Sequence, residues 1–293
     1  MKNSIIRINT SDNAELQGIL YEPEKSKEII FIHVHGYAGN FYENHFLDYY
    51  SGFLTKNDIA FLSFNNRGHD YISDIPVHKE SRIDFISGGS AYERVSWINN
   101  DIDAAVNYAL KLGYKEIYLQ GHSLGCNKVF KYIIDSRHDF IKQCVLLAPC
   151  DIVNYEIETD GREVYDKKVE IAKKLFNNGN GSSLISNSEY GVYKWEMVSA
   201  ETFLDFREEN NIIDYFKYRK EGCKCEEFDS LSIPLTVIIG SEDEYINGTD
   251  KAERFFKDNY TYDKLSVNII KGAMHSFYGY EAEIMKILEK KII

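Results

Sequence analysis

Short apolar runs alternate along the chain with segments whose apolar residues recur every three or four positions. A short continuous apolar run is typical of a strand that is covered on both faces. A recurrence of three or four residues is typical of an amphipathic helix. Repeated strand–helix units predict a mostly parallel sheet with helices on both faces. We expect strands at 29–32, 59–64, 117–119, 144–147, 235–239 and 267–270, and helices at 41–56, 95–112, 126–134, 251–257 and 280–290.

Two segments near the N-terminus depart from this alternation. Residues 4–9 and 15–21 are strand-like runs separated by the turn-forming sequence Ser11-Asp12-Asn13, which predicts an antiparallel hairpin at a sheet edge. Residues 71–94 contain Gly88-Gly89-Ser90 and show no clear period. We therefore expect a long loop there, and loops of such length are usually functional or mobile.

From 151 to 231 the chain is polar and lacks the alternation. Apolar residues at helical spacing between Tyr165 and Phe176 predict one helix, and Tyr193, Trp195 and Met197 alternate with charged residues as in a strand. We interpret this region as an insertion that forms a lid. The expected domains are a core of residues 1–150 and 232–293 and a lid of residues 151–231.

Length and composition agree with a globular protein. The 293 residues, 44% of them hydrophobic, suffice for one large core with a modest insertion. No run approaches the ~18 apolar residues of a membrane span, and residues 1–7 lack the features of a signal peptide. We therefore expect a cytoplasmic protein without membrane association. The net charge of −12 argues against nucleic acid as a partner, because phosphates require a basic face.

The five cysteines give no sign of a disulfide framework or a metal site. Cys126, Cys144 and Cys150 lie in or beside predicted core elements, where we expect small buried hydrophobic side chains. Cys223 and Cys225 form a C-x-C pair without the second ligand pair of a zinc site. We predict neither a metal nor a cofactor.

Gly121-His122-Ser123-Leu124-Gly125 stands between a predicted strand and a predicted helix. A sequence of the G-x-S-x-G type occurs by chance in roughly one chain in ten of this length. The motif alone is therefore weak evidence for a catalytic serine, and the elements on either side of it have to be considered. A strand, a sharp turn and a helix form the context of a nucleophile elbow, which presents its serine above the sheet. We predict that Ser123 is a catalytic nucleophile.

A serine nucleophile needs a base, and the base needs an acid that holds its tautomer. Asp243 and His275 each follow a predicted strand, in the order serine, acid, histidine. The other histidine beyond Ser123 is His138, at a helix end, where we expect a solvated side chain. We assign Asp243 as the acid and His275 as the base, while Glu242 and Glu244 remain alternatives for the acid.

The developing oxyanion needs two backbone N–H donors. We expect these from Leu124, after the nucleophile, and from Tyr37, where Gly36 lets the backbone approach closely. His35 is expected to brace this loop through its ring nitrogens. We assign four side chains to the substrate pocket. For the two aromatic residues of the predicted lid, Trp195 and Phe203, the alternative is a small apolar core within the lid itself. These four are His35, His122, Trp195 and Phe203.

These motifs together resemble the α/β-hydrolase superfamily. The resemblance implies an eight-stranded sheet with one antiparallel strand and a lid after the sixth strand. The elbow with Cys126 and Tyr132 is loosely similar to siderophore esterase-like members, and the oxyanion loop to feruloyl esterase-like members, whereas Asp70 replaces a glycine found in many esterases. The motifs are His35-Gly36, Asn66-Arg67-Gly68-His69, Gly121 to Gly125, Gly240-x-x-Asp243 and Gly272-Ala273-Met274-His275.

We therefore expect a serine hydrolase that cleaves a small-molecule carboxylic ester through an acyl-enzyme. The same residues would serve a thioesterase, an amidase or an acyltransferase. A lyase on the same fold and a noncatalytic hydrolase-like binding protein are further alternatives. The sequence does not predict an oligomeric state.

Overall fold

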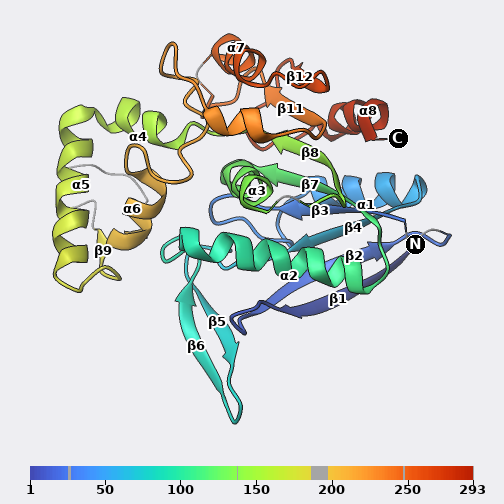
Figure 1. Cartoon of the computed structure of the whole chain (residues 1–293), viewed down its shortest axis with the longest axis horizontal. Helices are drawn as coiled ribbons and strands as arrows, with labels where there is room; N and C mark the ends of the chain where they lie inside the picture. Colours follow the sequence, from blue (N-terminus) through green and yellow to red (C-terminus); the bar gives the residue numbers. More distant parts are fainter. Residues whose placement is uncertain (26–27, 137, 186–196, 247, 293) are drawn as a thin grey trace.

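The computed structural model describes residues 1–25, 28–136, 138–185, 197–246 and 248–292. Its centre is an eight-stranded sheet in which β2 runs opposite to both of its neighbours and the other pairings are parallel (Figure 1). The predicted sheet with one antiparallel strand is thus confirmed. The spatial order is β1 (Lys2–Asn9), β2 (Glu15–Glu22), β4 (Ile59–Phe64), β3 (Ile29–Val34), β7 (Glu116–His122), β8 (Ile141–Leu147), β11 (Leu235–Gly240) and β12 (Leu265–Ile270).

Helices cover the sheet, as predicted. α1 packs against β4 and α8, whereas α2 and α3 pack against each other and against β3 (Figure 1). β4 is buried along its whole length, and the ring of Tyr50 on α1 lies 5.5 Å from that of Phe31 on β3. Such aromatic contacts between helix and sheet form the main core. The helices are α1 (Phe46–Lys56), α2 (Ile98–Lys111), α3 (Leu124–Asp135), α7 (Thr249–Asn259) and α8 (Glu281–Ile292).

The segment after β8 contains elements that the sequence did not predict. Besides the expected α5 (Arg162–Asn177), it forms α4 (Ile152–Asp160), α6 (Ala200–Arg207) and the short pair β9 (Leu184–Ile185) and β10 (Val198–Ser199). α4, α5 and α6 lie together beside the sheet and share a second apolar cluster that includes Tyr165 and Phe203 (Figure 1). The expected strand at Tyr193 and Trp195 lies outside the described residues.

Residues 208–231 return to the main core. Phe216 and Phe228, the latter in the 3-10 helix η3 (Glu226–Ser230), contact the rings of Phe130 on α3 and Phe256 on α7. The segment 151–231 therefore divides between two apolar clusters, with 152–207 contributing to both and 208–231 joining the main one.

The expectation of a loop at 71–94 is wrong. This segment contains the antiparallel pair β5 (Ser73–His78) and β6 (Ile83–Gly88), which projects from the core, followed by the 3-10 helix η1 (Val95–Trp97) (Figure 1). Ile75 and Val77 alternate inward and pack with Ala14, whereas their neighbours are partly exposed. The alternation of buried and exposed residues that is typical of a strand is present on β5. It is hard to recognise in the sequence, because only Ile75 and Val77 are buried apolar residues and Pro76, also apolar, lies between them.

Candidate active site

Ser123 lies at a sharp turn between β7 and α3. Its φ of 57° is unusual for a residue other than glycine, and its backbone N–H donates to the carbonyl of Leu147 over 2.9 Å. A Cβ at Gly121 would lie 2.2 Å from the oxygen of Gly125, and a Cβ at Gly125 would lie 2.2 Å from the oxygen of Val34. The close approach of backbone segments explains both glycines of the motif.

His275 and Asp243 meet at the carboxyl ends of β12 and β11. His275 Nδ1 lies 2.9 Å from Asp243 Oδ2 and 3.1 Å from Oδ1, and Asp243 is buried. Because a carboxylate accepts, Nδ1 carries the proton and Nε2 keeps a free lone pair. Glu244 accepts instead from the backbone N–H of His275, and Glu242 from the Ser241 hydroxyl. The geometry therefore favours Asp243 among the three predicted acids.

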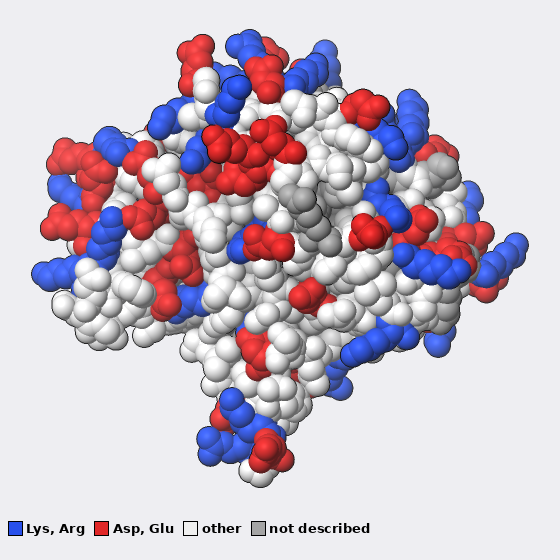
Figure 2. All heavy atoms as spheres, viewed as in Figure 1, with Lys and Arg blue, Asp and Glu red and all other residues white. Residues whose placement is uncertain are grey.

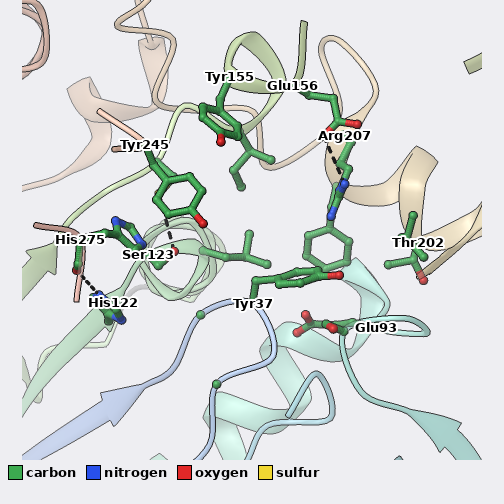
Figure 3. A pocket seen from close by; sticks show the side chains of 18 of the residues that line it. Tyr37, Glu93, His122, Ser123, Tyr155, Glu156, Thr202, Arg207, Tyr245 and His275 are labelled. Carbon is green, nitrogen blue, oxygen red and sulfur yellow. Dashed lines mark hydrogen bonds and ion pairs between the residues drawn. The ribbon is translucent and has the colours of Figure 1, made fainter. Parts of the chain in front are cut away.

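Ser123 and His275 line the same end of one cavity (Figure 3). In this structure Ser123 Oγ lies 3.6 Å from Cys150 Sγ. Burial, followed by the charge of Asp243, raises the pKa of the Cys150 thiol to about 12, so that the thiol stays neutral near pH 7. A buried thiol with a raised pKa is typical of an unreactive cysteine, whereas Ser123 lies on the sharp turn and lines the same cavity as His275, which makes Ser123 the candidate nucleophile.

His122 supports His275 from below. Its Nε2 donates to the backbone oxygen of His275 over 3.0 Å, and the two rings lie 5.1 Å apart (Figure 3). Burial, followed by the charge of His275, lowers the pKa of His122 to about 3. A neutral His122 is therefore positioned to fix the backbone of the candidate base rather than to carry protons.

The predicted oxyanion loop packs against the elbow. A Cβ at Gly36 would lie 2.8 Å from Ser123 Cβ and 3.1 Å from the nitrogen of Leu124, so only glycine allows this approach. Leu124 is the first residue of α3, where a helix leaves its N–H groups without intrahelical partners. Tyr37 follows Gly36 and lines the same cavity as Ser123.

His35 braces this loop from inside the protein. It is 1% exposed, its Nε2 accepts from the backbone N–H of Asn66 over 3.1 Å, and its Nδ1 donates to the oxygen of Gly36 over 3.0 Å. Burial, followed by the charge of Lys128, holds the pKa of His35 well below its usual range. The assignment of His35 to the pocket is wrong, because both ring nitrogens are engaged behind the loop and the residue does not line the cavity.

Buried charges that the sequence analysis missed lie behind the loop. Lys128 Nζ donates to Asn66 Oδ1 over 3.2 Å and lies 2.5 Å from Glu93 Oε1. Arg67 is 1% exposed and pairs with Asp101 and Asp12, each at 2.7 Å. The Asn66-Arg67 motif thus anchors the strand end through side chains that are distant in the sequence.

The cavity has a volume of about 530 Å³ and two unlike ends. Figure 3 shows Ser123, His122 and His275 on one side of Tyr37, and Glu93, Thr202, Arg207 and Glu156 on the other. Of the four side chains assigned to the substrate pocket, His122 lines the cavity. Phe203 does not line the cavity, because it is 1% exposed within the second apolar cluster, which agrees with the alternative interpretation of this aromatic residue. Trp195 lies outside the described residues.

Ion pairs hold the end of the cavity that α4 and α6 form. Glu156 lies 2.7 Å from Lys168 Nζ and 3.1 Å from Arg207 Nη1, and Lys168 also pairs with Asp160. The Arg207 guanidinium lies 5.4 Å from the centre of the Tyr37 ring, and this contact connects α6 to the loop that follows β3. Burial would raise the pKa of Glu156, but Arg207 and Lys168 lower it below its usual value. No sequence motif marks these pairs, since their partners come from different helices.

No group of three or more histidine, cysteine, aspartate or glutamate side chains among the described residues is arranged to hold a metal ion. All five cysteines are free, and Cys225 Sγ donates to Glu227 Oε2 over 3.1 Å. Within the described ranges, no helix has the length and apolarity needed to cross a membrane. On the face shown in Figure 2, basic and acidic side chains are interspersed.

Comparisons with known proteins identify a matching family and solved structures of similar architecture. A family model described as "Protein of unknown function (DUF1749)" matches residues 88–293, and none of the curated proteins matches the chain. The chain is similar in structure to Est1E from Butyrivibrio proteoclasticus with ferulic acid bound (TM-score 0.63, 18% identity, 97% of this chain and 96% of that chain).

Two further solved structures share the fold. One is a soluble variant of monoglyceride lipase from Saccharomyces cerevisiae in complex with a substrate analog (TM-score 0.65, 16% identity, 97% of this chain and 94% of that chain). The other is the Pyrococcus furiosus esterase Pf2001 (TM-score 0.59, 19% identity, 100% of this chain and 92% of that chain).

Proposed function

The chain belongs to the family described as "Protein of unknown function (DUF1749)", within the α/β-hydrolase superfamily, and we propose that it is a serine hydrolase that cleaves carboxylic esters. One observation carries the proposal. His275, which pairs with Asp243, and Ser123, on its positive-φ turn, line one end of the same cavity. The printed names of two structural neighbours, an esterase and a lipase, agree with ester chemistry.

In the proposed reaction, Ser123 Oγ attacks the ester carbonyl while His275 Nε2 takes its proton. Asp243 stabilises the resulting imidazolium through Nδ1–H, and the N–H groups of Leu124 and Tyr37 donate to the oxyanion. Collapse breaks the bond to the alcohol, which leaves with the proton from His275. Water then attacks the acyl-enzyme, again with His275 as base, and releases the carboxylic acid and Ser123.

We also propose that residues 151–231 act as a lid. The part that would cover the substrate is the group α4, α5 and α6, because Tyr155 and Glu156 of α4 and Thr202 and Arg207 of α6 line the cavity opposite Ser123 (Figure 3). Val198 and Phe206 give the same wall apolar surface.

The proposal is tested by hydrolysis of fluorogenic esters of increasing acyl length. We expect turnover by the wild-type protein, a burst of alcohol release that reports the acyl-enzyme, and a fall in kcat of at least about 10⁴-fold for Ser123→Ala. Addition of an alcohol acceptor should leave the free acid as the main product; a transferred ester as the main product would establish an acyltransferase. The absence of turnover by folded protein would support a noncatalytic binding protein.

A further inference from the structure

The cavity continues beyond Tyr37 to a polar end that the proposed reaction does not use. Ser90 and Glu93 come from the segment between β6 and η1, and Thr202 and Arg207 come from α6. Figure 3 shows Glu93, Thr202 and Arg207 grouped on the side of Tyr37 opposite Ser123 and His275. A substrate that fills the cavity would therefore meet these groups with a part distant from the scissile bond.

Ser90 has a buried hydroxyl whose hydrogen-bonding capacity is unused. The residue is 1% exposed, and its Oγ has no hydrogen-bond partner within the described residues. The Ser90 backbone N–H donates to the oxygen of Asp70 over 2.9 Å, which fixes its place in the cavity wall. An unpaired buried hydroxyl destabilises a protein, and the place of Ser90 in the cavity wall makes a polar group of a ligand the candidate partner.

The charges around this end balance one another. Three carboxylates (Glu93, Glu156, Asp160) line the cavity and pair with three cations (Lys128, Lys168, Arg207). A charged ligand would have to break one of these pairs or remain uncompensated in a buried site, which is costly. A neutral hydroxyl can donate to the spare lone pairs of a carboxylate and accept from the Ser90 hydroxyl.

We propose that this polar end is a subsite for a hydroxyl group of a neutral ester substrate, and that Ser90 and Glu93 determine this specificity. The inference rests on the proposed esterase function and names its substrate class. The hydroxyl can belong either to the acyl chain or to the alcohol of the ester, since both extend from the same carbonyl.

Two matched pairs of esters distinguish these sources. Methyl ω-hydroxyhexanoate and methyl hexanoate differ on the acyl side, whereas ω-hydroxyhexyl acetate and hexyl acetate differ on the alcohol side. For one pair, we expect the wild-type kcat/KM to favour the hydroxylated ester about tenfold. Ser90→Ala should lower that preference about fivefold, which corresponds to the loss of one hydrogen bond.

Ser63→Ala is the matched control. The Ser63 hydroxyl is also buried without a hydrogen-bond partner in the described part of the chain, but it lies on β4 and does not line the cavity. We expect Ser63→Ala to keep the wild-type preference. Neither substitution should lower the melting temperature through a lost hydrogen bond, because neither hydroxyl has a partner to lose.

Three results would overturn the inference. The first is hydrolysis of the plain esters by the wild-type protein without a preference for the hydroxylated ester in either pair. The second is a preference for the hydroxylated ester that is equal in Ser90→Ala and Ser63→Ala. The third is a clear drop in the melting temperature of Ser90→Ala alone, which would reveal a structural partner for its hydroxyl. Hydrolysis of none of the four esters would contradict the proposed function itself, and the inference with it.

Discussion

The two ends of the cavity are held in place by different physical means. Around Ser123 the backbone does the positioning: Gly36, Gly121 and Gly125 allow chain segments to approach within distances that a Cβ would prevent. At the lid end, side-chain ion pairs such as Glu156–Arg207 connect helices that have few other contacts with the core. The first end therefore requires residues without a Cβ, and the second requires paired charged side chains.

This difference determines how each end responds to substitution. Where two backbone segments are in direct contact, there is no space for a side chain. One added methyl group should therefore disrupt the end of the cavity around Ser123. An ion-pair network shares its charges among several partners, so that the loss of one leaves others in place. We expect the lid end to tolerate change better than the elbow.

The largest effect should come from the acid. Asp243→Asn should lower kcat about 10⁴-fold, because an amide no longer holds the His275 tautomer or stabilises the imidazolium. Glu244→Gln is the matched control and should cost less than about tenfold, since Glu244 accepts a hydrogen bond from the backbone N–H of His275 and not from its ring. Steady-state kinetics on one ester measure both. Equal losses in the two variants would contradict the assignment of Asp243.

The next effect concerns the glycines of the elbow. Gly125→Ala would place a Cβ 2.2 Å from the backbone oxygen of Val34, and we expect it to lower the free energy of unfolding by about 3 kcal/mol or more. Gly52→Ala, on α1 with open space around it, should instead raise it by about 0.5–1 kcal/mol. Urea denaturation measures both, and a tolerated Gly125→Ala would show that the elbow can relax.

At the lid end, Arg207→Met should lower the free energy of unfolding by about 2 kcal/mol, because Glu156 would keep only Lys168 as its cation. Arg162→Met, which breaks an exposed pair with Glu209, should leave the melting temperature unchanged. Thermal denaturation followed by near-UV circular dichroism tests the two. Similar melting temperatures for both variants would mean that the buried pair does not hold the lid end.

The effect that is smallest near neutral pH is a dependence of the free energy of unfolding on pH. Burial lowers the pKa of His33 and of His122 to about 3, so both bind a proton more readily when unfolded. Their contribution is complete above pH 6.5 and is lost as the pH falls toward 3, by about 1.4 kcal/mol per pH unit for each. His33→Asn should make this decline shallower in urea denaturation between pH 7 and pH 5. An unchanged slope would show that the pKa of His33 is the same in the folded and the unfolded protein.

The sequence predicted the core better than the lid because the two encode their structure differently. A strand such as β4 is recognisable because five of its six residues are apolar, and Ser123 is recognisable from the glycines two positions away on either side. α6 has only eight residues, and its contacts with α5 and with Tyr37 come from distant segments. The pairs Lys128–Glu93 and Arg207–Glu156 have no local signal, because they join residues 35 and 51 positions apart.

The pocket residues illustrate the same limit. Local context placed His122 in the cavity, since it adjoins Ser123, but placed His35 there wrongly. The partner that turns His35 away from the cavity is the backbone of Asn66, in a strand end that only the folded sheet brings near. Ser90 and Glu93 were hidden in a segment without a clear period.

The central claim is that Ser123 is an activated nucleophile, and covalent labelling tests it most directly. Intact mass is measured after treatment with a fluorophosphonate, for the wild-type protein and for Ser123→Ala. We predict a single adduct on the wild-type protein and none on the variant. An unlabelled wild-type protein that is folded, or an adduct that persists in Ser123→Ala, would contradict the claim.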